Sequence, residues 1–296
     1  MNNWASKLNS GWLQYAALVS LLVAMNIGIE QLTDAGITGA EVLLLRSICN
    51  LIAALFIAGY SKKNIIPKQP KLQLGAFICL GSSLLLIFTA YQYISAGSVS
   101  TLQRLDIPLL LLIAAFGGHS KLSQTLLAVL AFVLVTILLI LNKTTDEDPI
   151  GYLIVLSAVA IICINTLLQK KIAVTENIQT IILISSLSSV FWGGFRCWQT
   201  NSTFANIHFD SLLAIVGLSF ANLLIFYIVN DFYKKESPEV VRYPYLLAAF
   251  LTMITEMIIE HKIFNPILIV GNISILILLT MLVRSRQKTL MSSLTH

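Results

Sequence analysis

Charged side chains are scarce in this chain of 296 residues: they make up 11% of it, whereas hydrophobic residues make up 57%. An ordinary soluble domain carries about a quarter charged residues, so this scarcity excludes a soluble globular protein. The hydrophobic residues gather in long runs, and about 20 of them are enough for a membrane-spanning helix. Lipid accepts such a helix because its backbone hydrogen bonds are satisfied internally. The sequence therefore predicts an all-α polytopic membrane bundle.

Several kinds of functional motif are also missing. The four cysteines have no CxxC spacing, which favours packing roles over disulfides or metal binding. The phosphate loop GxxxxGK[ST] and the HExxH and GxSxG motifs do not occur, so ATP-driven transport by this chain alone is excluded and no enzyme is indicated. The four histidines lie in predicted connectors or the C-terminal tail, so we expect no metal or other cofactor. The basic residues are scattered among connectors, which argues against a nucleic-acid partner.

Ten apolar runs are long enough to be transmembrane helices. We expect them near residues 11–32, 40–60, 72–94, 98–116, 123–141, 151–173, 178–197, 211–232, 237–259 and 264–283. The connectors are short, which predicts a single integral membrane domain. With the N-terminus inside, the inner segments carry 13 basic residues and the outer segments carry 3. The positive-inside rule therefore predicts that both termini are cytoplasmic.

The ten runs divide into two halves of five, residues 1–148 and 149–296. Because five is odd, the second half must enter the membrane upside down, which makes an inverted repeat suited to alternating access. Asn26 and Asn165 recur at similar places in the two halves, and Pro108 and Pro244 each interrupt a span. Paired interruptions point to a binding site at the bilayer midplane, although each proline could also make an ordinary kink.

Short segments in a particular order carry a resemblance to a known family. They are Glu41-Val42 followed by Arg46, the segment YISAG at 93–97 leading to Pro108, the end of the eighth span leading to Pro244, and Glu260. In this respect the chain resembles the ten-span, EamA-type branch of the drug/metabolite transporter superfamily. The segment RYPY at 242–245 is similar to bacterial S-adenosylmethionine carriers within it. The resemblance implies a bacterial inner-membrane carrier that moves small metabolites.

Ionised side chains inside predicted spans are functional candidates, because a charge in the bilayer costs several kcal/mol. Arg46, Arg104, Arg242 and Asp106 lie in such spans. Arg104 and Asp106 are two residues apart and point to different sides of a helix, so each needs another partner. Arg242 is three residues from Glu239 and could pair with it locally. Each group could line a cavity or form a structural salt bridge, and Asp106 could instead carry a coupling proton.

Three further acids, Glu30, Glu41 and Glu256, are expected near the outer ends of their spans, where water solvates them at little cost. Amide and aromatic side chains complete the candidate site, because amides hydrogen-bond a ligand and aromatic faces hold organic cations or planar bases. Tyrosines could equally anchor at the membrane interface. The candidate substrate-binding residues are Asn26, Arg46, Tyr91, Arg104, Asp106, Asn165, Trp192, Asn222, Tyr227, Arg242, Tyr243 and Tyr245.

The sequence thus favours a secondary carrier or exchanger of a small zwitterionic metabolite, such as an amino acid or an S-adenosylmethionine-like molecule. Intramembrane arginines would receive its carboxylate, and acidic or aromatic groups its cationic group. One alternative is an exporter of amphipathic drugs or toxins, for which the arginines would matter little. A non-transporting membrane protein is another. The direction of flux, the coupling ion and the choice between monomer and homodimer stay open.

Overall fold

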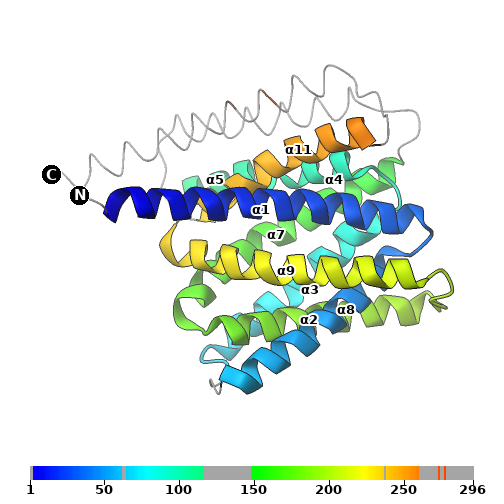
Figure 1. Ribbon diagram of the computed structural model, residues 1–296, viewed down its shortest axis with the longest axis horizontal. Coiled ribbons are helices and arrows are strands. Elements are labelled where there is room, and N and C mark those ends of the chain that lie inside the picture. The colour runs from blue at the N-terminus through cyan, green and yellow to red at the C-terminus, as the bar shows by residue number, and fades with distance from the viewer. Residues whose placement is uncertain are drawn as a thin grey trace.

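The computed structural model describes residues 3–61, 65–116, 148–236, 238–259, 273 and 277, and every regular element over these residues is helical (Figure 1). The predicted span near 123–141 lies outside the described residues, as does the span near 264–283 apart from residues 273 and 277. The helices are α1 (Asn3–Asp34), α2 (Gly39–Ser61), α3 (Pro70–Ala90), α4 (Ala96–Gln103), α5 (Asp106–Phe116), α7 (Pro149–Thr175), α8 (Ile178–Gln199), α9 (Phe209–Lys235), α10 (Pro238–Val241) and α11 (Tyr243–Ile259).

Six of these helices are long and apolar enough to cross a membrane, judged by length and composition: α1, α2, α3, α7, α8 and α9. Each matches a predicted span to within a few residues, apart from α1, which begins earlier than expected. Their outward side chains include many large apolar groups, such as Phe56, Phe191 and Phe220. Lipid can cover such surfaces without cost, whereas water cannot. The all-helical, multi-pass membrane character predicted from the sequence is confirmed to this extent.

Two predicted spans are broken into pairs of helices. The run 98–116 is divided between α4 and α5, with Arg104 and Leu105 at the break, and the run 237–259 is divided between α10 and α11, with Arg242 at the break. Pro108 and Pro244 lie in the first turns of α5 and α11, where a missing backbone N–H leaves no helical hydrogen bond unmade. Each proline therefore lies in the first turn of a new helix and does not kink a continuous one.

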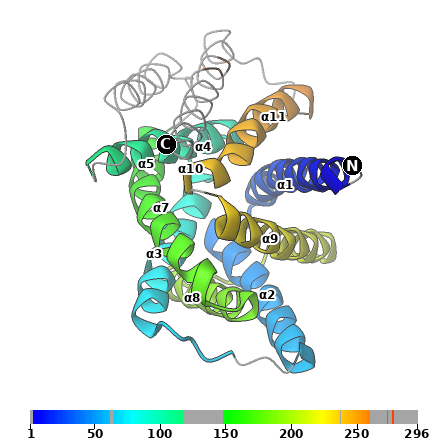
Figure 2. The same ribbon diagram turned by 90° about the vertical axis from the view of Figure 1, so that its left-hand side faces the viewer.

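The long helices pack as neighbours that are distant in sequence. Contacts join α2 to α8, α3 to both α7 and α8, and α1 to both α9 and α11. In Figure 2, which looks almost along the long helices, α1 and α9 lie side by side, and α7 lies beside α3. Close approach of α8 depends on small residues: a Cβ at Gly193 would lie 3.0 Å from the backbone nitrogen of Leu44, and one at Gly81 would overlap Trp192 and Ser188.

Candidate functional site

A cavity of about 180 Å³ opens among α1, α3, α7, α9 and the two breaks. A water molecule needs roughly 10–15 Å³ by the same measure, so the cavity has room for about a dozen waters or one small metabolite. Seven of the twelve residues predicted for the site line it. They are Asn26, Tyr91, Arg104, Asn165, Asn222, Arg242 and Tyr245. The tertiary structure thus brings residues from both halves of the chain to one place.

Arg104 and Arg242 both reach this cavity because each sits at the break of a helix. A broken helix exposes backbone groups and lets a side chain turn inward between the two segments. The guanidinium carbon of Arg104 lies 5.3 Å from the centre of the Tyr245 ring, and that of Arg242 lies 4.9 Å from it. These are cation–π distances. Tyr245 on α11 therefore holds two cations from opposite halves of the chain.

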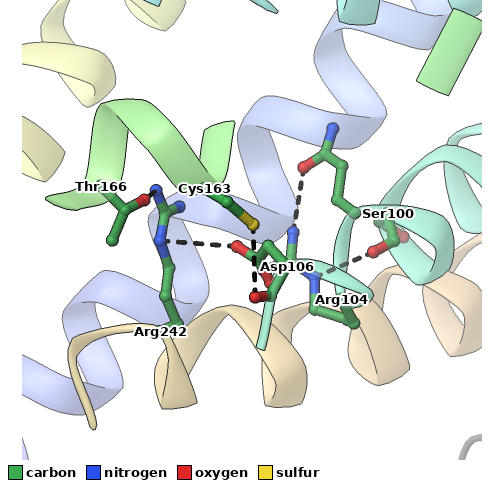
Figure 3. Close-up of polar contacts among 7 residues, drawn as sticks. Ser100, Arg104, Asp106, Cys163, Thr166 and Arg242 are labelled. Carbon is green, nitrogen blue, oxygen red and sulfur yellow. Dashed lines mark hydrogen bonds and ion pairs between the residues drawn. The ribbon is translucent and has the colours of Figure 1, made fainter. Parts of the chain in front are cut away.

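Asp106 neutralises one of these two arginines. Its Oδ2 atom lies 3.5 Å from Nε of Arg242, and Arg242 also donates a short hydrogen bond to the hydroxyl of Thr166 on α7 (Figure 3). Asp106 is 1% exposed and lies at the first position of α5, where its backbone carbonyl accepts from Sγ of Cys163 at 3.5 Å. As expected, the ion-pair partner of Asp106 is not Arg104 but a residue distant in sequence, at the break between α10 and α11. The side chain of Glu239, the local partner predicted for Arg242, lies outside the described residues.

Arg104 has a different environment. Nε donates to the Ser100 carbonyl at 2.9 Å, and Nη2 donates to Oε1 of Gln103 at 2.9 Å (Figure 3). Within the described part of the chain it forms no ion pair, and its Nη1 has no hydrogen-bond partner. The residue is 4% exposed. Arg104 is thus a buried cation that faces a cavity and has only neutral hydrogen-bond partners, while the carboxylate of Asp106 acts on it electrostatically without forming an ion pair.

Arg46 does not line the cavity but lies directly behind its wall. Its guanidinium carbon is 4.7 Å from the centre of the Phe88 ring, and Nη1 is 3.5 Å from Oδ1 of Asn222 and 3.8 Å from the sulfur of Met25. Phe88, Asn222 and Met25 are themselves lining residues. Arg46 is 1% exposed, and no carboxylate among the described residues forms an ion pair with it.

The remaining predicted residues do not reach the cavity. Tyr227 is 61% exposed on the outer side of α9. Trp192 on α8 packs edge-on against Phe191, with ring centres 5.8 Å apart, and lies close to Gly81. Tyr243, the first residue of α11, is partly buried and packs against the main apolar core. The structure therefore gives these three aromatic residues packing or lipid-facing positions.

Sequence reasoning missed several lining residues that helical spacing could have found. Phe226 and Asn230 follow Asn222 at intervals of four on α9, and Gln169 follows Asn165 by four on α7. Residues four apart share one face of a helix, so the candidates Asn222 and Asn165 predict that residues four positions further on also face the cavity. Gln103 gave no such signal, because it faces the cavity only where α4 ends. Ser83 and Tyr233 also line the wall.

The three further acids are buried instead of lying at a hydrated interface, which corrects the expectation for them. Oε1 of Glu30 accepts from the backbone N–H of Ala96 at 3.0 Å, and Oε1 of Glu256 accepts from that of Gly97 at 2.6 Å. Both carboxylates thus meet the N-terminus of α4, where exposed N–H groups and the helix dipole favour negative charge. The fully buried start of this short helix depends on them.

Glu41 has a comparable structural position at the start of α2. It forms a capping box with Thr38, in which the Thr38 N–H donates to Oε2 at 2.9 Å and the Glu41 N–H donates to the Thr38 hydroxyl at 3.3 Å. Its Oε1 accepts from the N–H of Phe204 at 3.2 Å, which ties the α8–α9 connector to α2. Glu41 therefore stabilises the bundle without lining the cavity.

Comparison with known proteins supports the fold alone. No family model and no curated protein matches this chain. A solved structure described only as "Crystal structure of protein" is similar to it, with a TM-score of 0.68 and 14% sequence identity, over 95% of this chain and 99% of that one. At so low an identity the similarity concerns the arrangement of the helices and says nothing about activity.

Proposed function

We propose that this protein is a secondary transporter or exchanger of a small metabolite, working by alternating access. One observation carries the proposal: Arg104, a buried cation with no ion-pair partner among the described residues, faces a cavity at the point where two broken helices meet. An unpaired charge at membrane depth is costly, so it is kept where a function uses it. A carboxylate of the metabolite is the partner that a guanidinium prefers.

The arrangement of helices supports the alternating-access part of the proposal. We propose that residues 1–148 and 149–296 form two five-helix inverted repeats, ten membrane-spanning helices in all. A twofold relation between the halves would exchange α1 with α7 and α3 with α9. The contact of α3 with α7 and the contact of α9 with α1 would then be equivalent, and both are present. The corresponding helices α2 and α8 pack against each other. The breaks at Arg104 and Arg242 also occur at corresponding places. Rocking of one repeat against the other would then expose the cavity to each side in turn.

The lining residues suggest a role for each part of the wall. Arg104 binds the carboxylate, and Tyr245 holds its guanidinium in place from the opposite half of the chain. Phe226 and Tyr233 offer aromatic faces for an apolar or cationic part of the metabolite. Amides such as Asn165 and Asn230 supply hydrogen bonds that fix its orientation. A zwitterionic metabolite such as an amino acid or S-adenosylmethionine would use both the cationic and the aromatic parts.

We further propose that the chain is a ten-span, EamA-type member of the drug/metabolite transporter superfamily, in a bacterial inner membrane with both termini cytoplasmic. The short segments common to that family support this, as do the breaks beside Pro108 and Pro244. The excess of basic residues on one side, 13 against 3, supports the orientation. The unit that transports is a monomer or a homodimer in lipid, and it uses neither a cofactor nor ATP.

Counterflow tests the proposal without assuming a coupling ion. Purified protein is reconstituted in liposomes, and exchange of labelled S-adenosylmethionine and of a panel of amino acids, acidic ones included, is measured. We expect saturable exchange of at least one solute, its loss in Arg104→Ala, and its retention in Tyr227→Ala, which alters an outer aromatic residue. Size-exclusion chromatography checks that both variants remain folded.

Absence of exchange for every solute in the panel would contradict the proposal and favour a non-transporting membrane protein. Exchange that persists in Arg104→Ala would favour export of amphipathic compounds, for which the apolar wall of the cavity matters more than its cations.

A further inference from the structure

We infer that the ligand of the cavity carries a net negative charge: it has a carboxylate or phosphate group that no cationic group of its own balances. This narrows the proposed substrate class to metabolites with more acidic than basic groups, such as acidic amino acids, in place of neutral zwitterions or S-adenosylmethionine. For transport the inference rests on the proposed function, whereas the binding of anions can be tested separately. The inference depends on the charges around the cavity and on which hydrogen-bonding atoms are left to face it.

The charged residues in the cavity wall are all basic. Among the described residues that line it, Arg104 and Arg242 carry charge and no aspartate or glutamate is present. Asp106 lies behind the wall and pairs with Arg242. One positive charge in the wall, that of Arg104, is therefore left without an ion-pair partner in the described part of the chain. A ligand with a carboxylate and an ammonium group would leave its own cation without an acidic partner in this wall.

A second uncompensated cation lies just behind the wall. Arg46 is 1% exposed, its contacts are with Phe88, Asn222 and Met25, and its Nε atom has no hydrogen-bond partner in the part of the chain that the structure describes. Neither buried cation has an ion-pair partner among the described residues, and such a charge is unfavourable unless an anion approaches it. Screening by water is weak at such depth, so the field of Arg46 acts across its side of the wall.

The acids elsewhere in the bundle lie outside the wall, although Glu30 and Glu256 act electrostatically on Tyr91, which is a lining residue. Glu30 and Glu256 hold the first N–H groups of α4, and Glu41 holds the start of α2 and the N–H of Phe204. Each of these carboxylates thus stabilises a helix end or a connector. None of the three belongs to the cavity wall.

The arginines also change which atoms of two amides can meet a ligand. Oδ1 of Asn222 accepts from Arg46, and Oε1 of Gln103 accepts from Arg104. Because their oxygens are engaged, both side chains have N–H donors left for a ligand. A wall that offers a guanidinium and amide N–H groups fits the lone pairs of a carboxylate or phosphate. One amide oxygen in the wall, Oδ1 of Asn165, has no hydrogen-bond partner among the described residues and can accept from a donor of the ligand, but no carboxylate in the wall balances an ammonium charge.

Pairs of probes that are similar in size and differ by an acidic group test the binding. The melting temperature of the purified full-length protein in detergent is measured against L-glutamate and L-glutamine, and against phosphoserine and serine, in the millimolar range at constant ionic strength. We expect at least one acidic member to raise the melting temperature more than its uncharged partner. The first pair detects a carboxylate site and the second a phosphate site.

Variants assign the effect to the cavity. Arg104→Gln should weaken binding of the stabilising anion about tenfold or more, because charge-assisted hydrogen bonds are lost. It should leave the melting temperature without ligand unchanged or higher, because an unpaired buried charge is removed. Arg196→Gln is the matched control: this arginine lies on α8, contacts Gln199 at 3.3 Å and does not line the cavity. It should bind anions like the unaltered protein.

Equal or greater stabilisation by glutamine and serine would overturn the inference, as would anion stabilisation that survives in Arg104→Gln. Counterflow with the same four solutes separates this result from the proposed function. Charge-selective binding without exchange supports the anionic ligand and contradicts transport. Exchange of the zwitterionic members at rates equal to those of the acidic members supports transport and overturns the inference.

Discussion

Arg242 and Asp106 join the breaks of the two interrupted helices, with 3.5 Å between Nε and Oδ2, although they come from opposite halves of the chain. Asp106 begins α5, and Arg242 lies between α10 and α11. The pair cancels the charge of one arginine at the cavity and leaves that of Arg104 available. It also ties together the two segments that would have to separate if the halves move against each other.

We expect Asp106→Asn to lower the free energy of unfolding by about 3 kcal/mol, because it leaves the guanidinium of Arg242 largely buried without a counter-ion. Unfolding by denaturant in detergent micelles, followed by tryptophan fluorescence, measures the change. The double variant Asp106→Asn/Arg242→Gln should recover part of the loss, since no unpaired charge then remains.

An exposed ion pair provides the comparison for this prediction. Asp231 and Lys235 lie 2.6 Å apart on α9, and their side chains are 33% and 62% exposed. Asp231→Asn should change the stability by less than about 1 kcal/mol, because water and salt screen such a pair. Equal losses in Asp106→Asn and Asp231→Asn would contradict a special structural role for the Asp106–Arg242 pair.

Two glycines of α2 should respond oppositely to alanine. A Cβ at Gly39 would overlap the backbone carbonyl of Phe88, whereas a Cβ at Gly59 would have no atom within 4 Å. We expect Gly39→Ala to destabilise the protein by about 3 kcal/mol, because backbone cannot move aside as a side-chain end can. Gly59→Ala should stabilise it by up to about 1 kcal/mol through helix propensity. Thermal unfolding of both variants measures this contrast.

The ring of Tyr245, and not its hydroxyl, should matter for ligand binding. It holds Arg104 and Arg242 at cation–π distances, so Tyr245→Phe keeps the contact and Tyr245→Leu removes it. We expect a several-fold loss of affinity in Tyr245→Leu, which corresponds to about 1 kcal/mol, and little change in Tyr245→Phe. Binding of the stabilising anion measures both. An equal loss in both variants would show that the hydroxyl, which both lack, is what the ligand needs.

The proposed orientation can be checked with single cysteines in a variant that lacks the four native ones. Thr203 lies in an exposed connector expected outside, and Lys171 lies near the end of α7, exposed and expected inside. A membrane-impermeant maleimide should label Thr203→Cys on intact cells and Lys171→Cys only after permeabilisation. The reverse pattern would place the termini on the outer side.

The pattern of proline and apolar residues predicted much of the local structure. Pro108 and Pro244 lie beside real breaks, because a proline ring cannot continue a helix from the preceding turn. The apolar runs match six long helices for a related reason: composition over about 20 residues decides whether a segment can lie in lipid. The expectation for Glu30, Glu41 and Glu256 failed, because position along a span does not tell whether a carboxylate meets water or a buried helix end.

What the sequence by itself determined is therefore the all-helical membrane character, the extent of the long helices and the positions of the two breaks, since these follow from local chemistry. Only the tertiary structure decided which charges meet. A helix sequence shows which residues share a face but not which neighbour that face contacts. The pairing of Asp106 with Arg242, the burial of Arg46 behind the wall and the exposure of Arg104 to a cavity all depend on packing between distant segments.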